Sequence, residues 1–135
     1  MLFRNEYAFL SNFYPCSVKL NFDGRILTFK NAEAAYQACK NFDRAPEFCG
    51  LDGKSAKYLG RQVTMRPDWD DVKITCMIAV LQAKFQQNPE LMRKLKSVRE
   101  NIVEENAWGD RYWGVCRGTG ENHLGKLLME LRDAG

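Results

Sequence analysis

Two segments near the N-terminus alternate apolar and polar side chains, which is typical of strands with one buried face. They span residues 16–22 and 25–29, with the pair Asp23-Gly24 between them. A two-residue hairpin turn requires positive φ angles, which glycine adopts readily. The pattern therefore predicts a β-hairpin.

Beyond the hairpin, apolar residues recur with the spacing of amphipathic helices. The predicted helices cover residues 32–42, 46–51, 55–63, about 70–87, a segment that starts at Pro89 and a segment that starts near Asn122. Asn31 is a suitable N-cap for the first helix, and Pro89 is suited to the first position of the helix that it begins. The run CMIAVL at 76–81 is apolar all round, which predicts that the 70–87 helix is central and buried. Residues 102–103 are predicted to form a short strand.

These elements predict an α+β fold: a compact, mainly helical single domain over residues 1–135 with a small N-terminal β-hairpin. The length suits one hydrophobic core, and 45% hydrophobic residues is an ordinary globular composition. The net charge of +3 is too mild to indicate nucleic acid, although it suits a phosphorylated ligand.

Other features of the composition bear on location and metal binding. The longest apolar run is far shorter than a membrane span, and the N-terminus has no signal-peptide pattern, so we expect a cytoplasmic protein without membrane contact. The chain has 5 cysteines, no CxxC pair and 1 histidine. We therefore expect free thiols, no metal and no cofactor.

The stretch from 106 to 125 combines aromatic residues, glycines and a carboxylate directly before a helix. Aromatic rings stack on bases, and backbone N–H groups at a helix N-terminus receive anions, so the stretch favours a nucleotide-like ligand. The alternative is a tight turn whose rings belong to the core. His123, at the helix start, is expected to be exposed and is given no role.

Glu33, Gln37 and Lys40 share one face of the predicted 32–42 helix. Such a stripe either faces a ligand or is a solvated face. Lys84, late in the 70–87 helix, either reaches a phosphate or snorkels to solvent.

Asp110, in the aromatic stretch, is either a ligand-binding carboxylate or a turn-former. Trp69 and Trp113 are either stacking platforms or parts of the core.

Several spaced motifs resemble the NADAR superfamily, also called YbiA-like, over nearly the whole chain. In order they are FLSNFYP at 9–15, AEAAYQACK at 32–40, PDW at 67–69, KF at 84–85, DRYWG at 110–114 and GENHLGKLLMELR at 120–132. The resemblance implies a compact, mainly helical fold with a small β element. It also implies cleavage of N-glycosidic bonds, because some members act on ribosylated pyrimidine intermediates of riboflavin synthesis. Others remove ADP-ribose from guanine bases of nucleic acid.

The resemblance also implies roles for individual residues. The family's essential glutamate falls on Glu33, and its site aspartate on Asp110, so these two are the expected catalytic residues. The expected substrate-binding residues are Asn12, Phe13, Gln37, Lys40, Trp69, Lys84, Trp113, Gly120 and Asn122. Asp110 is expected either to bind ribose hydroxyls or to protonate the base. Asn122 and backbone donors between 118 and 122 are expected to seat a phosphate.

The leading hypothesis is a metal-free N-glycosidase. Its expected partners are a small ribosylated or phosphorylated substrate, such as a riboflavin intermediate, or ADP-ribosylated guanine in nucleic acid. A second hypothesis is a non-catalytic module that binds ADP-ribose or NAD. A third is a nucleic-acid-binding accessory domain, suggested by basic clusters over 54–61 and 93–99.

Overall fold

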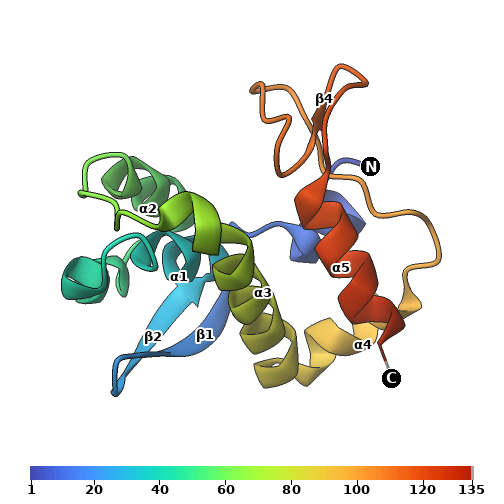
Figure 1. The fold of residues 1–135 in the computed structure, drawn as a ribbon. Coiled ribbons are helices and arrows are strands. Elements are labelled where there is room, and N and C mark those ends of the chain that lie inside the picture. Colours follow the sequence, from blue (N-terminus) through green and yellow to red (C-terminus); the bar gives the residue numbers. More distant parts are fainter. Residues whose placement is uncertain (135) are drawn as a thin grey trace. The chain divides into compact units, whose positions relative to one another are not determined.

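The computed structural model describes residues 1–134 and divides into two units (Figure 1). One unit is Asn12–Pro89, and the other joins Met1–Ser11 to the chain from Glu90 onward. Helices predominate, and the only sheets among the described residues are two-stranded. The expected α+β class with an N-terminal hairpin is therefore confirmed, whereas the single domain over 1–135 stays a prediction.

The predicted hairpin is present at the start of the Asn12–Pro89 unit. Strand β1 (Pro15–Phe22) pairs antiparallel with β2 (Arg25–Asn31), and Phe22 lies opposite Arg25. Asp23 and Gly24 have φ angles of 52° and 92°, as the two-residue turn requires. The hairpin packs against the helices α1 (Ala32–Ala38) and α3 (Trp69–Gln87).

Helix α1 (Ala32–Ala38) follows the hairpin without a loop, because Asn31 ends β2 and caps the helix. Its Oδ1 accepts from the backbone N–H of Ala34 at 2.7 Å, and its Nδ2 donates to the carbonyl oxygen of Leu51 at 2.9 Å. The predicted end at residue 42 is wrong, because Asn41 caps a new 3₁₀ turn by accepting from the N–H of Arg44.

Replacing Asn31 by alanine is expected to lower the free energy of unfolding by about 1 kcal/mol, because the buried cap acceptor is lost. Chemical denaturation of the wild type and Asn31→Ala measures this. Asn31→Ser keeps a cap oxygen and is the control. Equal stability of Asn31→Ala and the wild type would contradict the capping role.

Three further helices complete this unit. They are the 3₁₀ helix η2 (Phe42–Phe48), α2 (Gly53–Gly60) and α3 (Trp69–Gln87). The helix predicted over 46–51 is wrong, because η2 begins and ends earlier. Helix α2 begins two residues before the predicted start, since Asp52 accepts from the N–H of Ser55 at 2.8 Å as its cap.

Helix α3 is not buried on all sides, contrary to the prediction. Met77, Val80 and Leu81 are buried, whereas Ile78 is 37% exposed and Ala79 is exposed as well. The helix packs against β1 and α1 (Figure 1), and these neighbours bury one side of it.

The other unit contains a short 3₁₀ helix, two helices and a small parallel sheet. Its elements are η1 (Asn5–Leu10), α4 (Pro89–Ser97), which begins at the junction, β3 (Glu105–Asn106), β4 (Val115–Cys116) and α5 (His123–Asp133). Pro89 begins α4 as predicted. The strand predicted at 102–103 is wrong, because β3 lies at Glu105–Asn106 and pairs with β4. No helix within residues 1–134 has the length and apolar character needed to cross a membrane.

Candidate active site

Glu33 lies in the first turn of α1, and only 9% of its surface is exposed. Its backbone N–H donates to the carbonyl oxygen of Asn12 at 2.9 Å, which ties the segment before the hairpin to the helix start. The helix dipole favours a carboxylate here, but an exposed position would satisfy the dipole equally well. A buried carboxylate needs hydrogen-bonding partners to offset its lost hydration.

Gln37, one turn further along α1, is one such partner. Its Nε2 donates to Oε2 of Glu33 at 2.6 Å, and both side chains are buried. The predicted common face of Glu33 and Gln37 is therefore real. The alternative that this face is solvated is wrong for both residues.

Lys40 lies beyond the last turn of α1 and is half-buried. Its Nζ is 3.5 Å from the carbonyl oxygen of Gly60 and 5.9 Å from the centre of the Trp69 ring. Burial lowers the pKa of Lys40, while the negative charge of Glu33 acts in the opposite direction. The carboxylate and the ammonium group thus interact electrostatically within one unit.

Trp69 begins α3 and is buried. Its ring lies 5.3 Å from the ring of Tyr36 at an angle of 52°. The indole is therefore largely part of the core, next to the Lys40 ammonium group.

Asn12 and Phe13 differ in exposure although they are neighbours. Asn12 is buried, and its Nδ2 lies 3.5 Å from the sulfur of Met77. Phe13 is 43% exposed and borders an open cavity of about 350 Å³, together with Lys30, Asp52 and Ser55. The backbone carbonyl group of Asn12 accepts the hydrogen bond from the N–H of Glu33, whereas the ring of Phe13 is partly exposed.

Lys84 is completely buried on α3, so the expectation that it snorkels to solvent is wrong. Its Nζ lies 5.1 Å from the ring centre of Phe85 and 6.0 Å from that of Tyr14. Burial lowers the pKa of Lys84 to about 8, while the nearby Cys16 thiol acts in the opposite direction. That Lys84 binds substrate stays a prediction.

Asp110 belongs to the other unit, where it forms a turn. Its Oδ1 accepts from the backbone N–H groups of Tyr112 and Trp113 at 3.1 and 2.9 Å, and its own N–H donates to Oδ1 of Asn106. This is the turn-forming alternative that the sequence left open. A catalytic role for Asp110 stays a prediction.

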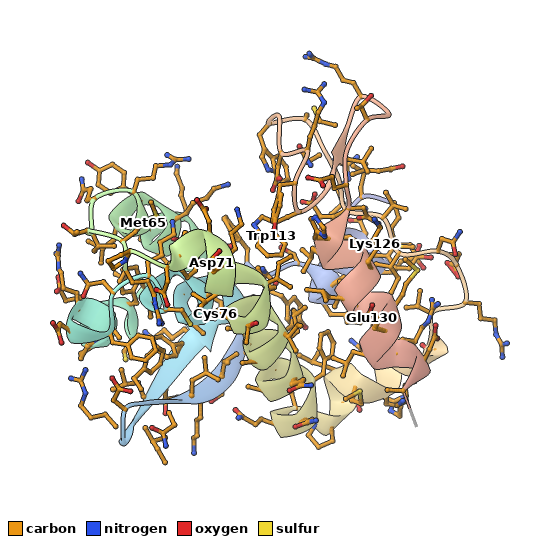
Figure 2. The ribbon with its side chains drawn as sticks, viewed as in Figure 1. Met65, Asp71, Cys76, Trp113, Lys126 and Glu130 are labelled. Carbon is orange, nitrogen blue, oxygen red and sulfur yellow. The ribbon has the colours of Figure 1, made fainter. Side chains whose placement is uncertain are left out.

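The aromatic residues of this loop pack on one another. Trp113, labelled in Figure 2, lies 4.9 Å from Tyr112 between ring centres, and Tyr112 lies 4.4 Å from His123. His123 is therefore only 27% exposed, which corrects the expectation that it is an exposed residue.

The first backbone N–H groups of α5 are already used. Those of His123 and Leu124 donate to the carbonyl oxygens of Tyr112 and Trp113 at 3.1 and 2.9 Å. These two N–H groups are therefore not available to an anion, because the preceding loop folds back onto the helix start, whereas phosphate binding by the donors between 118 and 122 stays a prediction.

Asn122 and Gly120 have structural roles in the same region. Oδ1 of Asn122 accepts from the N–H of Glu104 at 3.0 Å, and its Nδ2 donates to the carbonyl oxygen of Ile102 at 3.0 Å. A β-carbon at Gly120 would lie 2.2 Å from the carbonyl oxygen of Gly114. Both residues hold loops together, and their substrate contacts stay predictions.

Glu104 is a buried carboxylate that the sequence analysis missed. Its Oε2 accepts from Nδ2 of Asn106 at 2.9 Å, and the same Nδ2 donates to the carbonyl oxygen of Asp110 at 2.8 Å. Glu104 sits in a polar run that reads as exposed, so no local signal marks it. Within residues 1–134 no three His, Cys, Asp or Glu side chains are grouped so as to hold a metal ion.

The model of the NADAR domain matches residues 2–134. The chain belongs to the NADAR family. Similar curated proteins include the N-glycosidase YbiA of Escherichia coli (strain K12), which is 32% identical over 140 residues and covers 96% of this chain and 82% of that protein. The NMR structure of the E. coli protein YbiA has a TM-score of 0.81 at 33% identity, over 98% of this chain and 82% of that one.

Some relatives are much longer than this NADAR chain. A riboflavin biosynthesis protein of Vibrio vulnificus (strain YJ016) is 33% identical over 95% of this chain, which spans 35% of that protein. A chloroplastic riboflavin biosynthesis protein of Arabidopsis thaliana is 40% identical over 66% of this chain, which spans 15% of it. The family therefore includes proteins named for riboflavin biosynthesis and for N-glycosidase activity.

The Asn12–Pro89 unit of this NADAR domain brings together a buried carboxylate, an amide, an ammonium group and an indole. They belong to Glu33, Gln37, Lys40 and Trp69. Such a set can stabilise a developing positive charge and bind a polar or anionic group beside it. Asp110, Trp113, Gly120 and Asn122 belong to the other unit, and their joint action with Glu33 stays a prediction.

Proposed function

We propose that this chain is an N-glycosidase that hydrolyses the bond between a ribosyl or phosphoribosyl group and an aminopyrimidine heterocycle. The observation that carries the proposal is the buried Glu33 carboxylate, held by Gln37 and accompanied by Lys40. Relatives named N-glycosidase YbiA and riboflavin biosynthesis protein support both the reaction and the substrate class.

The chemistry explains why a fixed carboxylate suits this reaction. The oxygen of water bonds to C1′ of the sugar while the C1′–N bond breaks. The electron pair of that bond leaves with the nitrogen, which takes up a proton. Positive charge develops on the sugar, and the carboxylate of Glu33 stabilises it and accepts a proton from the attacking water. The ammonium group of Lys40 is suited to a phosphate or hydroxyl of the substrate.

A second substrate class fits the same reaction. ADP-ribosylated guanine in nucleic acid also carries a ribosyl N-glycosidic bond, but it would need to enter as part of a polymer. The names of the relatives favour the small pyrimidine, so we take it as the expected substrate.

Parallel assays of the wild-type protein test the proposal. A phosphoribosyl aminopyrimidine, an ADP-ribosylated guanine oligonucleotide and free ADP-ribose are incubated separately, and products are analysed by chromatography. We expect release of free heterocycle from the first. If ADP-ribose is released from the guanine oligonucleotide and no heterocycle is released from the pyrimidine, the proposed substrate class is wrong. If calorimetry shows that ADP-ribose binds and no base is released from either substrate, the proposed N-glycosidase activity is wrong and a binding module is favoured.

A further inference from the structure

We infer that Gly60, at the end of α2, sets the position of the Glu33 carboxylate through the side chain of Gln37. The effect on catalysis rests on the proposed function, but the effect on Glu33 itself does not. Gly60 is remote from Glu33 in sequence, and α1 and α2 pack together in the Asn12–Pro89 unit.

The carboxamide of Gln37 lies directly against the backbone of Gly60. A β-carbon at position 60 would lie 2.0 Å from Oε1 of Gln37 and 2.7 Å from its Cδ. The φ angle of Gly60 is not in the left-handed region, so its backbone conformation does not require glycine. Alanine would suit the helix better. Space for Gln37 is therefore what requires glycine here.

The orientation of the carboxamide follows from its two neighbours. A carboxylate only accepts hydrogen bonds, so Nε2 of Gln37 must face Glu33, and Oε1 must face the other way. On that side Oε1 is buried and has no hydrogen-bond partner among residues 1–134. An unpaired buried acceptor is unfavourable. Gln37 nevertheless keeps this orientation, with its amide confined between Glu33 and Gly60.

Gly60 also contacts the third residue of the polar stripe. Its carbonyl oxygen lies 3.5 Å from Nζ of Lys40. The end of α2 thus contacts both side chains that follow Glu33 on this face. Gln37 is a positioning residue in this arrangement, because its Nε2 is bound to Glu33 and its Oε1 is confined against Gly60. The expected binding of substrate by Gln37 stays a prediction.

Replacing Gly60 by alanine tests the inference. Gln37 has a flexible side chain whose end can move aside, so the variant is expected to fold, while the amide leaves Glu33. We expect kcat for base release to fall by about 10- to 100-fold, because even a small displacement of a reacting group slows the reaction by a factor of this size. The KM is expected to stay within about twofold of the wild-type value. Gly50→Ala is the matched control, since a β-carbon there meets nothing within 4 Å. Thermal unfolding monitored by circular dichroism verifies that both variants are folded.

Two further measurements separate positioning from a general structural effect. In a Gln37→Ala background, Gly60→Ala is expected to have no further effect on kcat, whereas independent structural effects would add. In protein labelled with carbon-13 glutamate, the carboxyl signal of Glu33, assigned by its absence in Glu33→Gln, is expected to shift in Gly60→Ala and not in Gly50→Ala.

The outcomes distinguish this inference from the proposed function. An unchanged Glu33 signal in Gly60→Ala would overturn the inference, as would a full effect of Gly60→Ala on kcat when Gln37 is absent. A wild-type protein that releases no base would overturn the proposed function alone, because the Glu33 signal tests the positioning without substrate.

Discussion

We expect the replacement of Glu33 by glutamine to lower the rate of base release from the proposed ribosylated pyrimidine by about 10²- to 10⁴-fold, the range typical of a lost general acid or base. Glutamine has nearly the size of glutamate, and its carbonyl oxygen accepts the hydrogen bond from Gln37. The variant is therefore expected to keep the packing of α1 and to lose the negative charge that, in the proposed function, stabilises the sugar.

The measurement is release of free heterocycle at saturating substrate, with folding followed by circular dichroism. Glu47→Gln is the control, because Glu47 is an exposed carboxylate of the same unit that pairs with Arg44. Wild-type turnover by a folded Glu33→Gln protein would show that this carboxylate is not catalytic.

Because Lys84 is buried, we expect the stability of the protein to rise with pH between about 8 and 10.5. Its pKa is about 8 in the folded protein, against an ordinary value of 10.5, because burial disfavours the charged form. Between these values the unfolded chain binds more protons than the folded one, so the free energy of unfolding increases with pH. Below pH 8 the ammonium group is charged in both states, and the full penalty of about 3 kcal/mol is present.

Chemical denaturation of the wild type and Lys84→Met at pH 7 and pH 9.5 measures this effect. The wild type is expected to gain about 2 kcal/mol relative to the variant over this interval. Cys16 titrates nearby, so Cys16→Ala is introduced into both proteins to remove its contribution. An identical pH dependence in the two proteins would show that Lys84 keeps an ordinary pKa in the folded state.

Local signals in the sequence determined several features of this fold. Asp23-Gly24 predicted the hairpin turn, Asn31 predicted the start of α1, and Pro89 predicted the start of α4. Each depends on the backbone preferences of one or two residues, which do not change with the surroundings. The spaced motifs also identified the family and, with it, the residue on which the proposed function rests.

Tertiary packing alone decided the environment of the candidate site. Helical spacing put Glu33 and Gln37 on one face, but only packing buried that face. The same holds for Lys84, which the sequence allowed to reach solvent, and for Asp110, whose carboxylate could bind a ligand or close a turn. The contact between Gly60 and Gln37 joins two helices. Burial and long-range contacts depend on which surfaces meet, and a periodic pattern along one chain does not specify the partner of each face.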